Sequence, residues 1–199
     1  MSRRKSEKQS FWNQKNIMSI FIVLIMTTSV MAFMFSGSTI NRTEYNGHTI
    51  KQVTSNEGET HYEVKGESYQ FSYPPESMDS LAIDDGVMVR LSATDMLSVT
   101  YNETSSFVED FAVLQLTLIE TLGERNTYVE AALTDDNPYG VPVRTCEHAT
   151  VSVPVIVLSE GEQPGITIDG DCLTLTGRGQ GDFLLLTEAI MYGMLGVIE

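Results

Sequence analysis

An uncharged apolar stretch near the start of the chain, residues 17–35, reads IMSIFIVLIMTTSVMAFMF. About 20 mostly apolar residues in a helix span the ~30 Å hydrocarbon core of a bilayer. Lipid offers backbone groups no hydrogen bonds, whereas a helix satisfies its own backbone. We therefore expect a transmembrane helix over residues 16–36, in contact with the lipid bilayer.

The charge before this stretch predicts its orientation. Residues 1–15 hold five bases and one acid, and such positive flanks stay in the cytoplasm. We expect a cytoplasmic leader at residues 1–15, a single-pass signal anchor in the cell membrane, and an extracytoplasmic remainder. The alternative is a cleaved secretory signal, but its apolar region usually holds only about 7–15 residues.

The part after the anchor has the size of one ordinary domain, about 160 residues, which can bury its own core. We expect a short polar tether at residues 37–45 and one α+β domain at residues 46–199. Beyond residue 15 the chain carries seven bases and 26 acids, because 12 bases and 27 acids are present in total. So acidic a surface repels nucleic acid, and it suits a salty medium or the recruitment of cations or of a basic partner.

The first part of this domain has the pattern of a β meander. Asn46-Gly47 is a turn signal, because both residues accept positive φ at low cost. Strands are predicted at His48–Thr54, Thr60–Lys65 and Ser68–Tyr73. Pro74-Pro75 ends the meander, since proline cannot donate to a ladder.

The middle of the domain predicts a strand, a helix and a strand. A capping box, Ser106-x-x-Glu109, precedes apolar residues at helical spacing, and Gly123 supplies a left-handed stop. The apolar residues are Phe107, Phe111, Leu114, Leu118 and Leu122. Strands are predicted at Val87–Leu91, Met96–Tyr101 and Tyr128–Leu133. Two parallel neighbouring strands joined by a crossover helix are the usual result.

The last part predicts three more strands and a helix. The strands are Thr150–Leu158, Ile166–Ile168 and Cys172–Thr176, and the helix runs from Phe183 to Ile198 after an Asp182 cap. Glu188 is the helix's only charge before the terminus, so we expect the helix to be buried against the sheet. The second half thus has a βαβ-ββα, thioredoxin-like element order within a mixed α/β sheet, but without Cys-x-x-Cys.

The two cysteines, Cys146 and Cys172, lie on the side that we expect to be oxidising. They predict a disulfide that closes about 25 residues and stabilises the fold by roughly 3 to 4 kcal/mol. The alternative is a metal site formed with Glu147 and His148, although zinc requires four well-spaced ligands.

Other candidate sites are weaker. Asp135, Asp136 and Asn137 are oxygen ligands suited to calcium, but they lack the spacing of a twelve-residue calcium loop. They begin the irregular loop that ends at Arg144, and such loops often carry function. Residues 177–181 lack the Lys-Ser/Thr of a phosphate loop, and no nucleophile has a recognisable context. Asn41 and Asn102 match the glycan acceptor pattern, and we expect no cofactor.

Several short motifs carry a resemblance to a known family. They are residues 45–47 (YNG), 71–74 (FSYP), 154–156 (PVI) and 192–198 (YGMLGVI), together with both cysteines. With these motifs the chain resembles a family of small, single-span, uncharacterised membrane proteins of small-celled archaea. That family has an Asp-Arg pair in the final helix, where Glu188 keeps the acid and Ala189 replaces the base. The resemblance implies an anchored exterior domain and no particular activity.

These observations lead to two functional hypotheses. The first is a non-catalytic accessory or binding domain of the cell envelope that docks an envelope or membrane protein near the membrane. The second is a calcium-assisted surface hydrolase that uses acidic residues. An active site would gather several acids in a pocket beside the loop from Asp135 to Arg144, whereas a docking domain would show an apolar patch rimmed by acids.

Overall fold

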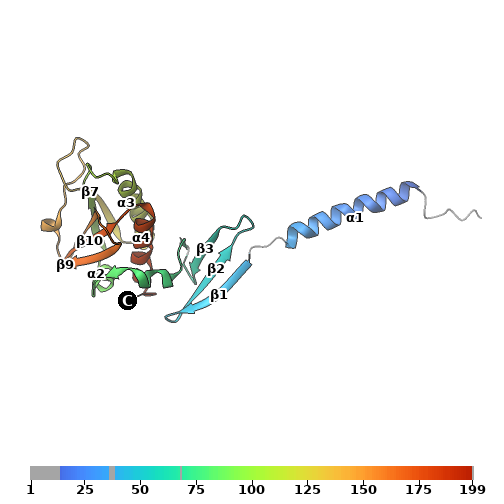
Figure 1. Cartoon of the computed structure of the whole chain (residues 1–199), viewed down its shortest axis with the longest axis horizontal. Helices are drawn as coiled ribbons and strands as arrows, with labels where there is room; N and C mark the ends of the chain where they lie inside the picture. The colour runs from blue at the N-terminus through green and yellow to red at the C-terminus, as the bar shows by residue number, and fades with distance from the viewer. Residues whose placement is uncertain (1–13, 36–38, 68, 199) are drawn as a thin grey trace, which may run out of the picture. The chain divides into compact units, whose positions relative to one another are not determined.

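The computed structural model describes residues 14–35, 39–67 and 69–198 (Figure 1). The chain divides into two compact units, one of residues 1–40 with the turn 54–59, and one of residues 41–53 and 60–199. The fold is mixed α+β, as expected, with two sheets.

Helix α1 spans Gln14–Phe35 and has 22 residues. Its apolar side chains from Ile17 to Met31 are exposed. The hydroxyl groups of Thr27 and Thr28 donate to backbone carbonyls of the preceding turn, so the helix satisfies them internally. Among the described residues, no helix combines the length and the apolar character that a membrane crossing requires.

The smaller sheet is the predicted meander with one strand added at its start. It contains β1 (Thr39–Tyr45), β2 (His48–Thr54), β3 (Thr60–Val64) and β4 (Gln70–Phe71), in that order. The expectation of a tether up to residue 45 is therefore wrong over its last seven residues. Asn46 and Gly47 have φ values of 46° and 79°, and this two-residue turn returns the chain as a hairpin. Of the strand predicted at Ser68–Tyr73, Ser68 lies outside the described residues, and β4 comprises Gln70 and Phe71.

The larger sheet has six strands in the order β5-β9-β10-β8-β6-β7. The strands are β5 (Ala82–Ile83), β6 (Met96–Tyr101), β7 (Tyr128–Leu133), β8 (Val155–Glu160), β9 (Gly165–Asp169) and β10 (Cys172–Gly177). β6 and β7 are parallel neighbours, as predicted from the strand-helix-strand pattern. The thioredoxin-like βαβ-ββα order is not the observed one, because β8 is an additional strand that lies between β6 and β10 and runs parallel to both.

Three helices accompany the larger sheet: α2 (Val87–Ser92), α3 (Val108–Gly123) and α4 (Gln180–Met194). The strand predicted at Val87–Leu91 is instead α2. A short apolar run fits either state, and here Val87, Met88 and Leu91 are buried on one helical face. Met88 packs on Gly193 of α4, where an added Cβ would collide with its sulfur, so the two helices approach closely.

The predicted helix ends differ in detail from the observed ones. The capping box at Ser106 does not form. Instead, Phe107 is the N-cap residue, and the carboxylate of Glu160 accepts bonds from the backbone and hydroxyl of Ser106. The left-handed residue after α3 is Asn126, not Gly123. Asp182 lies inside the first turn of α4, where its carboxylate binds Arg178.

Figure 1 shows α3 and α4 side by side, and both helices contact the larger sheet. The strands contribute apolar side chains to the core, for example Leu97 and Val99 of β6 and Leu173 of β10, and β6 is buried at every position from Leu97 to Tyr101. Two short 3₁₀ helices, η1 (Pro75–Ser80) and η2 (Cys146–His148), complete the fold. The core is therefore shared between the sheet and two adjacent helices, and the surface between these helices is the site considered next.

Candidate binding groove

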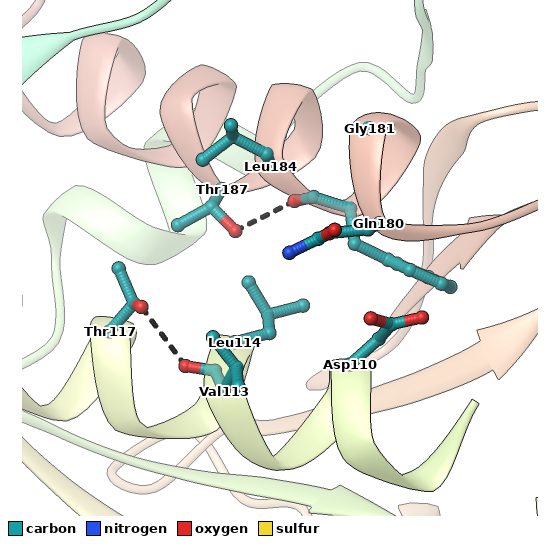
Figure 2. A pocket seen from close by; sticks show the side chains of 9 residues that line it. Asp110, Val113, Leu114, Thr117, Gln180, Gly181, Leu184 and Thr187 are labelled. Carbon is teal, nitrogen blue, oxygen red and sulfur yellow. Dashed lines mark hydrogen bonds between the residues drawn. The ribbon is translucent and has the colours of Figure 1, made fainter.

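A groove lies between α3 and α4 (Figure 2). It has a volume of about 350 Å³. α3 contributes Asp110, Val113, Leu114 and Thr117. These positions recur every three or four residues, which places them on one helical face. α4 contributes Gln180, Gly181, Phe183, Leu184 and Thr187, again at helical spacing.

A second hollow of about 440 Å³ continues along the same face of α3. Thr117 lines both hollows, and Glu120, Thr121 and Glu124 extend the series by the same three- or four-residue steps. Tyr69 and Gln70, at the start of β4, close its other side. The two hollows share Thr117 and lie along one face of α3, and we call them together the α3–α4 groove.

The apolar side chains of the α3–α4 groove lie in the first hollow, whereas the second hollow is lined mostly by polar side chains. Thr117 and Thr187 donate their hydroxyl hydrogens to carbonyl oxygens of their own helices, at 2.9 and 2.8 Å. Thr121 likewise donates to the carbonyl of Thr117. Figure 2 shows the first two of these bonds, with the side chains of Asp110 and Gln180 pointing into the space between the helices. Polar groups that are free to meet a ligand thus gather toward the ends of the groove.

The charged groups of the α3–α4 groove have one sign. Asp110, Glu120 and Glu124 line it, and among the described residues no lysine or arginine does. Asp110 is half-buried, while Glu120 and Glu124 are exposed. All three carboxylates belong to α3, with Asp110 in the first hollow and Glu120 and Glu124 in the second, and together we call them the acidic rim of α3.

Behind the groove, Glu188 of α4 holds the chain that follows β4. Its buried carboxylate accepts hydrogen bonds from the backbone N–H groups of Ser72, at 2.7 Å, and Tyr73, at 2.9 Å. Burial raises the pKa of Glu188, and the two N–H donors only partly oppose this effect. Tyr192 donates its hydroxyl hydrogen to the carbonyl of Tyr73 at 2.8 Å, and its ring stacks on Phe71. The smaller sheet is thereby fastened to α4.

Sequence reasoning anticipated the burial of α4 but missed the role of Glu188. The signal was a single acid in an otherwise apolar helix, and such an acid must find hydrogen-bond donors when it is buried. Its donors are backbone groups more than 100 positions away in the chain. A sequence pattern does not identify partners of that kind.

The predicted disulfide is confirmed. Cys146 and Cys172 are bonded, with their Cα atoms 5.2 Å apart. The bond ties η2 to the beginning of β10, and Arg90 of α2 fixes the adjoining chain by donating to the carbonyls of Thr150 and Val151.

A second attachment of the same segment is ionic. Arg144 donates to Glu130 of β7 at 2.8 and 3.2 Å, and Ser98 of β6 donates to the same carboxylate at 2.8 Å. Burial raises the pKa of Glu130, but these hydrogen bonds and the charge of Arg144 bring it below its ordinary value. Arg144, the last residue of the loop that contains the calcium candidates, is thus attached to β7. The disulfide attaches the chain at Cys146, just after this loop.

Two of the calcium candidates, Asp135 and Asn137, form hydrogen bonds with nearby residues of the chain. Asn137 uses its side chain to close the loop, accepting from the N–H groups of Tyr139 and Val141. Asp135 accepts from Thr134. Within the described ranges, no group of three or more histidine, cysteine or acidic side chains is arranged to hold a metal. Neither Asp135 nor Asp136 lines the α3–α4 groove.

The two glycan acceptor candidates lie at the surface. Asn41 is in β1, and Asn102 follows β6, where its side-chain oxygen accepts from the N–H and hydroxyl groups of Thr104. Both remain predictions.

Comparison of the chain with protein-family models, with curated proteins and with solved structures finds no match. Function must therefore be argued from the geometry of the chain itself, and the resemblance to small single-span archaeal proteins stays a prediction.

Proposed function

We propose that this protein is a membrane-anchored accessory or binding domain of the cell envelope, extracytoplasmic and non-catalytic, which docks a protein partner near the membrane. The observation that carries the proposal is the α3–α4 groove, in which an apolar hollow beside Asp110 adjoins a more polar hollow that holds Glu120 and Glu124. Val113, an apolar side chain in this groove, is 59% exposed. Exposed apolar surface with a polar rim is characteristic of interaction sites.

The same geometry favours docking over the calcium-assisted hydrolase. Glycoside cleavage, for example, needs two carboxyl groups on opposite sides of the scissile bond. The three groove carboxylates all come from one helix, with Thr and Leu side chains on the facing wall of α4. The loop acids Asp135 and Asp136 lie outside this surface. Docking of a partner does not require carboxyl groups on opposite sides of the groove.

The anchor in this proposal rests on the sequence. Residues 17–35 contain no charged side chain and follow a basic leader, and the exposed apolar side chains of α1 are consistent with contact with lipid. Protease added to intact cells should remove residues 38–199. Protection of these residues until the membrane is broken would contradict the proposed orientation.

Site-specific photo-crosslinking tests the docking surface. A photoreactive residue replaces Val113 in the groove of the full chain in its native membrane, and a matched variant carries it at Val151. Both side chains are exposed, Val151 at 76%, but Val151 does not line the groove. We expect a discrete protein adduct, identifiable by mass spectrometry, from Val113 alone. No adduct at Val113, or the same adducts from both positions, would refute docking through the groove.

A further inference from the structure

We propose that the segment that occupies the α3–α4 groove is a cationic amphipathic helix of the partner, an inference that rests on the proposed docking function. Its apolar face would lie on the groove wall, and its lysine or arginine side chains would face the acidic rim of α3. Three features of the groove lead to this proposal: its length, the state of its hydrogen-bonding groups and the sign of its charge.

One face of α3 lines both hollows of the groove along its length. Its lining residues on α3 run from Asp110 to Glu124, and at 1.5 Å per residue this distance is about 21 Å. A partner helix of about four turns covers that length. Side-chain rows on two neighbouring helices also leave a furrow into which the ridge of a third helix can pack.

The hydrogen-bonding groups of the wall favour a helix over an extended peptide. An extended segment must find partners for the backbone groups that it buries. The first hollow presents Val113, Leu114 and Leu184, and the hydroxyl of Thr117, where the two hollows meet, already donates to its own helix. A helix needs no such partners, because its backbone bonds are internal.

The charges of the groove specify the polar face of the occupant. Asp110 lies at one end, and Glu120 and Glu124 lie about 15 and 21 Å farther along α3. No base among the described residues lines the groove to neutralise them. A partner helix with one base near one end and two near the other would meet all three carboxylates. An acidic segment, or an anionic lipid surface, would be repelled.

The test measures binding of a synthetic peptide to the full chain in nanodiscs of zwitterionic lipid, relative to empty nanodiscs. The probe is a labelled 14-residue helical peptide with leucine on one face and lysine on the flanks, and its counterpart carries glutamate in place of lysine. Fluorescence anisotropy should show binding of the lysine peptide in excess of empty nanodiscs. We expect the glutamate peptide to bind at least about tenfold more weakly.

Matched variants then locate the binding. The groove variant is Asp110→Asn with Glu120→Gln and Glu124→Gln. The control variant is Asp169→Asn with Glu147→Gln and Glu162→Gln, which removes the same charge from exposed side chains outside the groove. The groove variant should weaken peptide binding by about tenfold or more, and the control variant by less than about twofold. The difference in affinity between the two variants should be smaller at high salt.

The proposal is overturned if the lysine peptide shows no binding beyond empty nanodiscs, if both peptides bind alike, or if the two triple variants weaken binding equally. The crosslink at Val113 separates these outcomes from a failure of docking itself. A protein adduct at Val113 without peptide binding would mean that docking is right and the partner's chemistry is wrong. Absence of both would remove the docking function.

Discussion

Replacing Glu188 with alanine should lower the free energy of unfolding by about 2–4 kcal/mol. The substitution removes the acceptor of two backbone N–H bonds, from Ser72 and Tyr73. Hydrogen bonds to a charged group contribute about 1.5–3 kcal/mol each, so the two bonds together are worth about 3–6 kcal/mol. Glu188 is buried, and no described base forms an ion pair with it. Replacing it with alanine therefore also removes the cost of burying a carboxylate, so we expect the free energy of unfolding to fall by less than this sum.

The pH dependence of the same site gives a sharper test. Burial raises the pKa of Glu188 above its ordinary value of 4.5, so the folded protein holds this proton more tightly than the unfolded chain. Stability contributed by the neutral carboxyl is complete below pH 4.5 and falls as the pH rises from 4.5 through the raised pKa. Glu188→Gln lacks this ionisation, so the difference in stability between wild type and this variant should fall over that range.

Urea unfolding of the full chain in detergent micelles, followed by near-ultraviolet circular dichroism of its tyrosines, measures both effects. Tyr192→Phe is a matched control at the same helix. It removes the bond to the carbonyl of Tyr73 and should cost about 0.5–1.5 kcal/mol without pH dependence from Glu188. If wild type instead gains stability over Glu188→Gln as the pH rises above 4.5, the carboxylate is favoured by its hydrogen bonds and our reasoning about burial is wrong.

Three further predictions concern the body of the domain, and unfolding in urea checks each. Replacing Cys146 with serine and Cys172 with alanine should cost about 3.5 kcal/mol, because the closed loop spans 26 positions; an unchanged midpoint would show that the loop stays ordered without the bond. Arg144→Met should lower the free energy of unfolding by about 1–2 kcal/mol near neutral pH. Since the pKa of Glu130 is lowered, the contribution of the Arg144–Glu130 pair is present above the ordinary value of 4.5 and is lost as the pH falls. A penalty that persists in acid would contradict this. Leu118→Ala removes a fully buried side chain of α3 and should cost about 2–5 kcal/mol, and a cost below 1 kcal/mol would mean that the helix does not pack as described.

Local patterns predicted the regular elements well where the apolar period was unambiguous. The strands at His48–Thr54, Met96–Tyr101 and Tyr128–Leu133 match β2, β6 and β7, and the helical spacing from Phe107 to Leu122 corresponds to α3. The disulfide was also predictable, because only two cysteines were available to pair.

The misplaced elements are those whose state depends on a neighbour. The run Val87–Leu91 is apolar enough for either a strand or a helix. In the folded chain it is helical, and its Met88 packs against Gly193 of α4. Residues 39–45 have the sequence of a polar linker. They form a strand because they pair with β2 in a hairpin. Neither partner can be identified from residues that are close in the chain.

The α3–α4 groove shows most clearly which features local sequence predicts and which depend on tertiary contacts. The amphipathic face of α3 can be seen in the printed residues because it follows a short period, and Glu188 stands out there as a single acid within an apolar run. Only the tertiary structure places these two helices beside each other and brings Tyr69 and Gln70 against α3, where the smaller sheet is attached through Glu188. Contacts between residues far apart in the chain depend on how all the elements pack at once, and no local period encodes them.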